Sequence, residues 1–241
     1  MTSAAAFEID ALEDTALLGE AAVLVWNDVA SEGREQFYDW HDKEHVPERL
    51  AIPGFRRGRR FARPGHSPEW LTMYEADDLS VVTSAAYLAR LNAPTPATER
   101  TLKYFRNTSR AVCRIVYSLG SSTGGHMLAM RLDVPSGQGE VLHEYVTSEA
   151  FPRALALTGV VACHLYAADE RASYIDTAES STRTFDVPSW VLLCEVTFAG
   201  AAEEARGVLE SRELKRLGVD VRSDAGIYTL EICRVSLPRK H

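Results

Sequence analysis

The chain has 241 residues, of which 46% are hydrophobic and 25% are charged. This composition is globular, and the length allows one large domain or two small ones. The formal net charge of −8 disfavours nucleic acids and acidic membranes as partners, because binding either needs a positive field. The N-terminus has no signal-peptide pattern, and no apolar run approaches the length of a membrane span. We therefore expect a cytoplasmic protein whose partner is a small molecule or another protein.

Hydrophobic periodicity predicts six elements in the first half of the chain. The order is strand, helix, strand, strand, helix, strand, at residues 21–29, 31–46, 55–61, 69–77, 79–91 and 109–119. Ser31 is the expected N-cap of the first helix, and Pro53 and Gly54 form the turn into the second strand.

The second half of the chain predicts the same order of elements. They fall at residues 125–134, 139–151, 160–167, 190–198, 201–214 and 225–235. Each half is then a split βαβ unit, the ferredoxin-like arrangement of an α+β protein. We expect an N-terminal extension at 1–20, a first domain at 21–118, a linker at 119–124 and a second domain at 125–237.

The two halves also match residue by residue. With an offset of 105, nine of the 27 residues from 28 to 54 are identical to their counterparts. Further along the chain the offset is 120, which pairs Trp70 with Trp190. The difference of 15 residues falls at 167–189, a polar segment rich in Ser and Thr that we expect to be a surface loop.

His41, Glu44 and His45 spell H-x-x-E-H, the zinc-binding pattern of inverted zinc peptidases. The two histidines stand one helical turn apart, so they could share a metal ion. Those peptidases need a third, acidic ligand downstream, yet the chain has no glutamate from 100 to 139. Pro47 is also expected to end the helix two residues after the motif. We therefore predict no metal site here.

The same helix can instead serve a pocket. Phe37, His41 and His45 fall on one stripe of the helix, and Phe37, Trp40 and Glu44 fall on another. A histidine in an apolar pocket is a natural general acid or base near neutral pH. His45 is accordingly the main catalytic candidate, with His41 and Glu44 beside it. The alternative is a partly buried histidine with a structural role.

The repeat indicates which half carries the chemistry. The second half has Val146 and Ala150 where the first half has His41 and His45. Residues that shape the helix are retained there while the imidazoles are lost. We therefore predict that any catalytic chemistry is confined to the first half and that the second half is scaffold.

Arginines occupy both faces of the second strand, in the sequence RRGRR at 56–60. By alternation, Arg57 and Arg59 face one side, and Arg56 and Arg60 face the other. Such charges are typical of a strand near a sheet edge, where they prevent sheets from associating. Arg59 or Arg60 is also a candidate for holding a substrate carboxylate or carbonyl.

Four aromatic residues are further candidates for contacting a substrate. Trp40 and Phe37 lie on the first helix, Tyr74 on the third strand and Tyr87 on the second helix. Aromatic side chains on a predicted core face are also ordinary packing residues.

A longer pattern extends from the first helix into the arginine-rich strand. It consists of Trp40, Glu44, His45, Pro47, Ile52, Pro53, Gly54, Phe55 and Arg60. This pattern resembles the dimeric α+β barrel superfamily, and within it the EthD-like branch. In such families two ferredoxin-like domains place their sheets face to face to form a barrel, with a pocket between each sheet and its helices. The resemblance implies that one chain supplies both halves as an intrachain pseudo-dimeric barrel, and that chains can associate as homodimers.

The sequence has no P-loop, dinucleotide-binding or nucleophile-elbow motif. We therefore expect a cofactor-free enzyme that uses histidine acid–base chemistry on a small hydrophobic or aromatic substrate. An isomerase, cyclase or lyase of catabolic or secondary metabolism fits this description. One alternative is a haem-binding dehydratase or monooxygenase-like barrel, for which the resemblance offers His45, His66 or His164 as axial ligand. The other is a non-catalytic protein that binds a small hydrophobic ligand.

Overall fold

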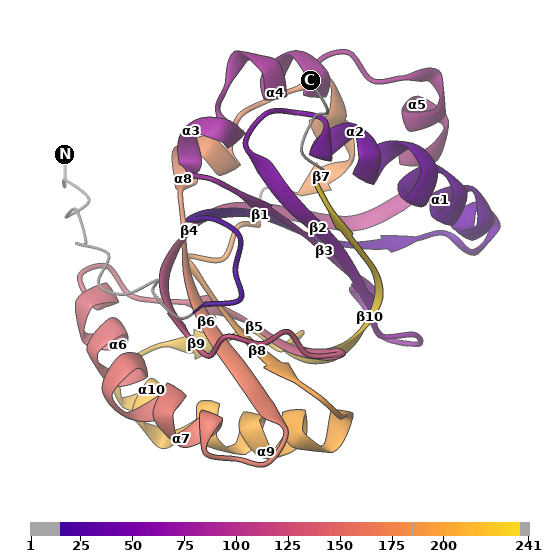
Figure 1. Ribbon diagram of the computed structural model, residues 1–241. Coiled ribbons are helices and arrows are strands. Elements are labelled where there is room, and N and C mark those ends of the chain that lie inside the picture. The colour runs from indigo at the N-terminus through magenta and orange to yellow at the C-terminus, as the bar shows by residue number, and fades with distance from the viewer. Residues whose placement is uncertain (1–14, 185, 237–241) are drawn as a thin grey trace.

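The computed structural model describes residues 15–184 and 186–236, and they form an α+β fold around a closed antiparallel barrel (Figure 1). The barrel has eight strands. They are β1 (Ala21–Val29), β2 (Phe55–Ala62), β3 (Trp70–Ala76), β4 (Phe105–Leu119), β5 (His126–Asp133), β6 (Val160–Ala168), β8 (Trp190–Val196) and β10 (Gly226–Val235). The order is β1-β3-β2-β10-β5-β8-β6-β4, and β4 pairs with β1 to close the ring.

Each half of the chain contributes four neighbouring strands. The first half supplies β4-β1-β3-β2 and the second supplies β10-β5-β8-β6, so corresponding strands follow the same order. The halves join where β2 pairs with β10 and where β4 pairs with β6. Both joints are antiparallel ladders, which leaves no open edge between the halves.

The helices lie outside the barrel in two groups on opposite sides (Figure 1). The first group consists of α1 (Arg34–Trp40), α2 (Val46–Leu50), α3 (Leu79–Val82), α4 (Ala85–Leu91) and α5 (Pro96–Leu102). The second consists of α6 (Gly139–Tyr145), α7 (Phe151–Leu155), α9 (Ala199–Leu209) and α10 (Arg212–Arg216). Each group covers the outer face of its own four strands, so the molecule has two helix–sheet layers and one barrel interior.

Two sequence-based expectations about the first helix are wrong. Ser31 begins a 3-10 turn (Ser31–Gly33) whose N-cap is Ala30, and the Ser31 hydroxyl bonds the Glu32 side chain. Pro47 does not end the helix. The chain passes through a π-helical turn (His41–His45) and continues as α2, because the amide of Val46 reaches back five residues to the carbonyl of His41. The wider turn accommodates a proline that lacks an amide hydrogen.

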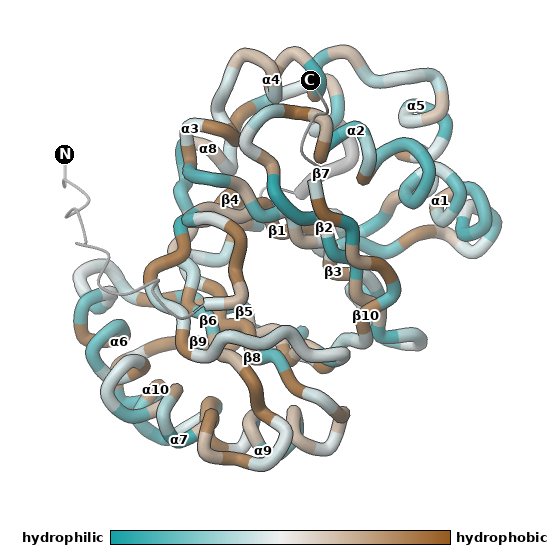
Figure 2. The backbone as a smooth tube through the Cα atoms, viewed as in Figure 1, coloured by the Kyte–Doolittle hydropathy of each residue, from teal (hydrophilic) through white to brown (hydrophobic). Residues whose placement is uncertain are grey.

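Side chains that point into the barrel form one hydrophobic cluster drawn from both halves. Its largest members include Trp26, Phe61, Leu71, Tyr166 and Tyr228. β2 is the exception among these largely apolar strands, since it carries the hydrophilic stretch seen in Figure 2. We expected β2 to lie near a sheet edge. It does not, because barrel closure gives it β3 on one side and β10 on the other.

The polar segment 167–189 is more than a surface loop. After β6 ends at Ala168 it forms α8 (Glu170–Ser173), a 3-10 turn (Ala178–Thr182) and β7 (Arg183–Thr184), which pairs in parallel with β4. Ser173, Glu179 and Ser180 are buried. The segment belongs to the second half of the chain but packs on the first, so Ser173 and Ser180 fill an interface that alternation could not predict.

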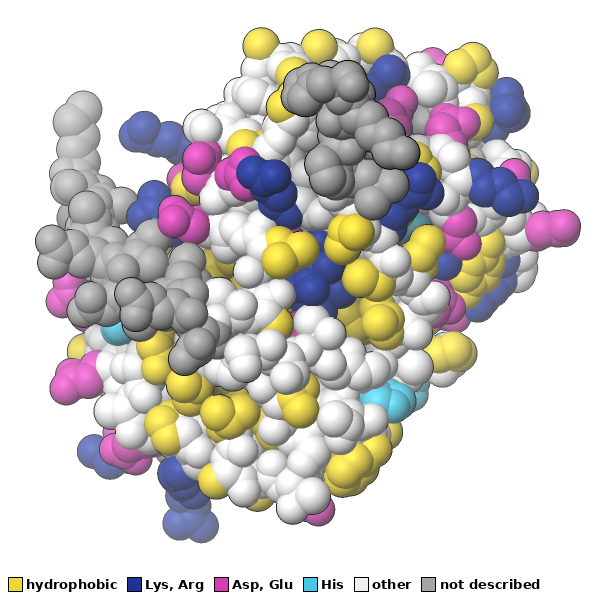
Figure 3. All heavy atoms as spheres, viewed as in Figure 1, with side chains coloured by type: hydrophobic (Ala, Val, Ile, Leu, Met, Phe, Trp, Pro, Cys, Tyr) yellow, Lys and Arg dark blue, Asp and Glu magenta, His cyan; other side chains and the backbone are white. Residues whose placement is uncertain are grey.

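The short β9 (Asp220–Val221) pairs with β5 beside the second helix group. None of the described helices has the length and hydropathy to cross a membrane. On the face drawn in Figure 3, acidic and basic side chains are interspersed, and hydrophobic side chains gather in small groups between them.

Candidate functional site

An aromatic and imidazole cluster lies between α1 and the outer face of the first four strands. His45 packs on Trp40, with ring centroids 4.3 Å apart, and lies 5.6 Å from the His41 ring. From the sheet side, Tyr74 meets His45 edge-on at 6.2 Å. We call Trp40, His41, His45 and Tyr74 the His45 cluster. Both histidines belong to the π-helical turn, His41 at its start and His45 at its end.

Tyr74 is held in the cluster by the strand beside it. Its partner across the ladder is Gly58 of β2, where a Cβ atom would lie only 3.1 Å from the Tyr74 ring. The missing side chain therefore lets the ring lie against β2. Tyr74 is 4% exposed, and its hydroxyl has no hydrogen-bond partner among the described residues. Burial raises the pKa of Tyr74 well above its ordinary value, so the phenol stays neutral and can donate a hydrogen bond.

His41 has a structural environment. Arg60 donates through Nη1 to His41 Nδ1 at 2.9 Å, which places the ring proton of His41 on Nε2. Burial lowers the pKa of His41 to about 4, and the charge of Arg60 acts in the same direction. His41 is therefore a neutral imidazole at neutral pH. It supports the cluster by positioning rather than by exchanging protons.

Arg60 faces the helix layer but is already paired with two carboxylates. It donates to Asp42 at 2.5 Å and to Glu231 of β10 at 2.8 Å. Its guanidinium carbon lies 4.7 Å from the Tyr38 ring centroid and 5.3 Å from that of Phe37. Arg60 thus ties α1 to β10, and Phe37 packs beneath it.

Glu44 also has a structural contact, at the start of α5. The hydroxyl of Thr95, the N-cap of α5, donates to Glu44 and accepts from the Thr98 amide. Trp40 donates through Nε1 to Thr98 Oγ1 at 3.0 Å. A groove of about 450 Å³ separates α1 from α5, and Trp40 and Glu44 line it. The groove brings solvent to one side of the His45 cluster.

The H-x-x-E-H residues are thus engaged with other groups, Glu44 with Thr95 and His41 with Arg60. Within residues 15–184 and 186–236, no three His, Cys, Asp or Glu side chains are grouped so that they could hold a metal ion.

Tyr87 lies deeper in the same layer, next to two buried arginines. Arg110 of β4 donates to the Tyr87 hydroxyl at 3.3 Å. Arg49 of α2 also lies over this ring, 5.8 Å from its centroid, and its Nη2 donates to both carboxylate oxygens of Glu179, at 2.6 and 2.7 Å. Glu179 comes from the segment 167–189 of the second half. The second half thus supplies part of the cover of the first-half layer.

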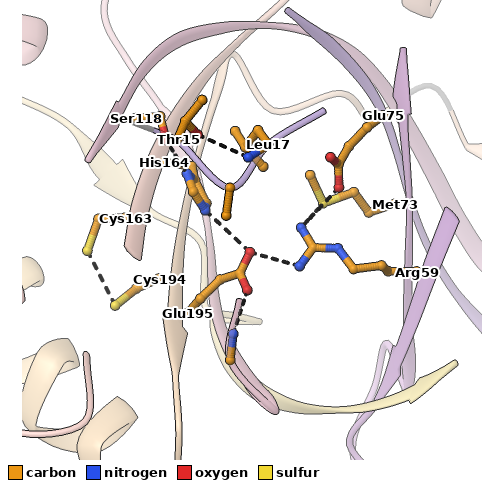
Figure 4. A network of polar contacts seen from close by, with 12 residues as sticks. Thr15, Leu17, Arg59, Met73, Glu75, Ser118, Cys163, His164, Cys194 and Glu195 are labelled. Carbon is orange, nitrogen blue, oxygen red and sulfur yellow. Dashed lines mark hydrogen bonds and ion pairs between the residues drawn. The ribbon is translucent and has the colours of Figure 1, made fainter. Parts of the chain in front are cut away.

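Arg59 lies away from the His45 cluster, inside the barrel (Figure 4). It donates to Glu195 at 2.8 Å and lies 3.1 Å from Glu75. Both ring nitrogens of His164 form hydrogen bonds there. Nδ1 lies 2.8 Å from the Ser118 hydroxyl, and Nε2 lies 3.3 Å from the Glu195 carboxylate. The alternation that separated Arg59 from Arg60 is correct, but Arg59 faces the barrel interior and not the helix layer.

The three histidines considered for haem have different surroundings. His164 is fully buried with both ring nitrogens engaged, so it is unsuited to be an axial ligand. His66 is exposed in the turn between β2 and β3. His45 is the candidate that lies in a helix–sheet layer, where Trp40 and Tyr74 flank its ring.

Sequence reasoning missed Arg110, Arg49 and Glu179. Arg110 is a single charge within the apolar run of β4, and this interruption of the strand was the available signal. Arg49 and Glu179 meet only because the segment 167–189 folds onto the other half, which leaves no local pattern.

The second helix–sheet layer is different in character. Its buried residues form one continuous hydrophobic cluster, in which Val146 and Ala150 take the places of His41 and His45. The buried hydrophobic residues of the first layer instead divide into two clusters.

Comparisons with known proteins give the fold but no close relative. No protein-family model matches the sequence, and no curated protein matches it. An anthrone oxidase-like protein has a similar structure, with a TM-score of 0.63 and 11% identity over 92% of this chain and 95% of that one. A monooxygenase candidate from Fusobacterium nucleatum has a TM-score of 0.52 and 10% identity over 91% and 95%. A chlorite dismutase from Candidatus Nitrospira defluvii has a TM-score of 0.53 and 8% identity over 88% and 90%. The structural neighbours are dimeric α+β barrel proteins, and at 8–11% identity the likeness shows that this chain shares their barrel fold.

Proposed function

We propose that this protein is a cofactor-free enzyme in which His45 moves a proton on a small aromatic substrate held in the first helix–sheet layer. One observation carries the proposal: a half-buried imidazole meets a buried phenol whose hydroxyl has no partner among the described residues, at 6.2 Å between the His45 and Tyr74 rings. The matching layer of the second half is continuous hydrophobic packing.

The pair suits proton transfer from a C–H bond that is conjugated with a carbonyl group. His45 removes a proton from a carbon conjugated with the carbonyl, and the electron pair of that C–H bond moves through the conjugated system to the carbonyl oxygen. Tyr74 stabilises the resulting enolate by donating its phenolic proton in a hydrogen bond. Return of the proton from His45 to another carbon completes an isomerisation, and loss of a leaving group completes a lyase reaction. Trp40 offers a flat apolar surface for an aromatic ring.

The anthrone oxidase-like neighbour suggests the kind of substrate to test. Anthrone is a tricyclic aromatic ketone whose ring CH₂ group loses a proton readily. An identity of 11% shows only a shared fold. The aromatic ketone as substrate class is therefore our own proposal. A compound of this kind has the carbonyl, the acidic C–H bond and the aromatic surface that the His45 cluster addresses.

We also infer that the chain is a tandem pair of ferredoxin-like domains, 21–118 and 125–237, in an intrachain pseudo-dimeric barrel of the EthD-like type. The sequence repeat supports this, and so does the matching strand order of the two halves. The π-helical turns support it too, because they fall at 41–45 and 146–150, an offset of 105. Under this proposal the first domain carries the active site and the second is scaffold.

The test of function is hydrogen–deuterium exchange of anthrone in D₂O, followed by NMR under anaerobic conditions. The wild-type protein should accelerate exchange at the CH₂ group, and His45→Ala should abolish the acceleration. The matched control is His143→Ala, which removes a half-buried histidine from α6, the corresponding helix of the second half. Both variants should keep the thermal midpoint within a few degrees, since such changes usually cost about 1 kcal/mol.

Each contrary result favours a stated alternative. Acceleration that survives His45→Ala refutes the role of His45. Binding of anthrone without acceleration by the wild-type protein favours a carrier. A Soret band in the purified protein, lost in His45→Ala, favours a haem-binding barrel.

A further inference from the structure

Arg110 is a buried cation without an acidic partner. Its side chain belongs to a residue that is only 4% exposed, in the middle of β4. Its hydrogen bonds go to two neutral oxygens, the carbonyl of Ala172 and the hydroxyl of Tyr87, both at 3.3 Å. Its Nε has no partner, and no carboxylate of the described residues lies within ion-pair distance.

The other buried arginines of the first half differ in this respect. Arg49 pairs with Glu179, Arg57 with Glu75, Arg59 with Glu195 and Arg60 with Glu231. Within the described part of this half, Arg110 is therefore the one buried arginine without an acidic partner. A buried guanidinium without a counter-charge is costly, because burial removes its hydration and the two long hydrogen bonds to neutral oxygens replace only part of it. A residue of this kind is retained in a fold more readily if an anion completes the site.

The position of Arg110 connects it to the His45 cluster. On the outer face of the sheet, Arg110 is opposite Val25, and Val25 is opposite Thr72 of β3, two residues before Tyr74. Arg110 therefore points into the same helix–sheet layer as Tyr74.

A chain of ring contacts runs through this layer from the proposed base to the guanidinium. Tyr74 is 6.2 Å from His45 and 6.3 Å from Phe55, measured between ring centroids. Phe55 is 5.2 Å from Tyr87, and the Arg110 guanidinium carbon is 5.9 Å from the Tyr87 centroid. Aromatic rings thus pack one against the next between the two polar ends.

We infer that the substrate of this layer is an aromatic compound that carries an anionic oxygen group, and that Arg110 is its counter-ion. The inference rests on the proposed function for the location of the reacting carbon, near His45. The anionic group binds at the deep end, where Arg110 offers its free Nε and two weakly engaged Nη groups. The Tyr87 hydroxyl, which now accepts from Arg110, adds a second polar contact for the same group.

The segment 167–189 is the cover of this deep end. Ala172 accepts the hydrogen bond from Arg110, and the Ser173 hydroxyl accepts from the Val112 amide at 2.9 Å. A groove of about 310 Å³ runs between α3 and α8, with Ala172 in its wall. A ligand that reaches Arg110 along this groove replaces the Ala172 carbonyl with a better, charged acceptor.

The experiment compares two ligands that differ in charge and little else, 2-naphthoate and 2-naphthamide. Their affinities are measured by calorimetry for the wild-type protein, Arg110→Met, Arg110→Lys and Arg114→Met. Arg114 is the matched control, since it lies on the same face of β4 but is exposed. The wild-type protein should prefer the carboxylate. Arg110→Met should weaken naphthoate binding about tenfold or more and change naphthamide binding little, as expected for loss of a charged hydrogen bond.

Arg110→Lys should retain part of the preference for naphthoate, and Arg114→Met should retain all of it. The inference is overturned if the wild-type protein does not bind naphthoate more tightly than naphthamide, or if Arg110→Met binds both as the wild type does. If Arg110→Met does not fold, the wild-type preference and the Lys variant decide the matter. His45→Ala separates the two proposals: if it keeps proton exchange while Arg110 still governs naphthoate binding, the proposed function fails and the anion site stands.

Discussion

Arg59 and Glu195 form a buried ion pair across the inside of the barrel, 2.8 Å long although the residues are 136 positions apart. Arg59 comes from β2 and Glu195 from β8, so the pair links the two halves of the chain. His164 reaches the same carboxylate oxygen from β6. At the offsets of the repeat, His164 corresponds to Arg59 and Glu195 to Glu75. Arg59 and His164, at corresponding positions of the two halves, thus contact the same buried carboxylate of Glu195.

The first prediction concerns acid stability. Burial alone would raise the pKa of Glu195, but the hydrogen bond with His164 and the charge of Arg59 lower it to about 2. A carboxylate whose folded-state pKa is depressed stabilises the protein above its ordinary pKa near 4.5 and loses that contribution as the pH falls toward 2. Glu195→Gln should remove this part of the acid transition, measured by circular dichroism between pH 5 and pH 2.

The same variant should be less stable at neutral pH, by about 3 kcal/mol in denaturant unfolding, because Arg59 loses a buried partner. Glu203→Gln is a suitable control, since Glu203 is exposed on α9. An unchanged acid transition in Glu195→Gln would show that the Arg59–Glu195 ion pair does not set the pH dependence of the stability of the protein.

The barrel interior also shows how far sequence patterns reach. Alternation correctly predicted that Arg59 and Arg60 face opposite sides, because successive side chains of a strand always do. It could not tell which side is the barrel interior, since that depends on β2 pairing with β10, about 170 residues later. The strands of each half, and their order along the chain, follow from local periodicity. The partners of individual charges follow from closure of the barrel.

The helix layer illustrates a second limit. The spacing of His41 and His45 indicated one shared face, and their rings do lie 5.6 Å apart. The environment of His41 depends on a tertiary contact, because Arg60 of β2 donates to its Nδ1. Burial of the polar segment 167–189 likewise depends on a surface supplied by the other half, so its composition alone indicated an exposed loop.

The second prediction follows from the environment of His41. Its pKa is lowered from an ordinary value of 6.5 to about 4 by burial. The unfolded chain therefore takes up a proton at higher pH than the folded protein, and stability falls as the pH drops from 6.5 to 4. The full effect is at most about 3 kcal/mol. His41→Gln, which can still accept from Arg60, should flatten unfolding free energy over this range, whereas His66→Gln should leave the slope unchanged.

The third prediction concerns the ion pair that fastens the covering segment. Arg49 and Glu179 are 2% and 5% exposed, so removing either partner leaves a buried charge uncompensated. Arg49→Met and Glu179→Gln should each lower the unfolding free energy by about 3 kcal/mol. The double variant should lose less than the sum of the two.

Both single variants should also speed amide exchange of residues 170–180, measured by mass spectrometry, while exchange in α9 stays the same. Glu170→Gln, an exposed change in the same segment, should do neither. Additive losses in the double variant would contradict a direct coupling of the two side chains.

The last prediction separates stability from activity at Tyr74. Its hydroxyl is buried and has no partner among the described residues, so it costs the folded protein desolvation and returns no hydrogen bond there. Tyr74→Phe should leave the thermal midpoint unchanged or raise it. The same change should slow anthrone exchange by about 10- to 100-fold, because the enolate loses its hydrogen-bond donor. Tyr117→Phe is the control, as an aromatic hydroxyl of the second half's layer, and should leave the exchange rate unaltered. Full activity in Tyr74→Phe would leave His45 without its proposed partner, and a clear loss of stability would mean that the hydroxyl serves the fold instead.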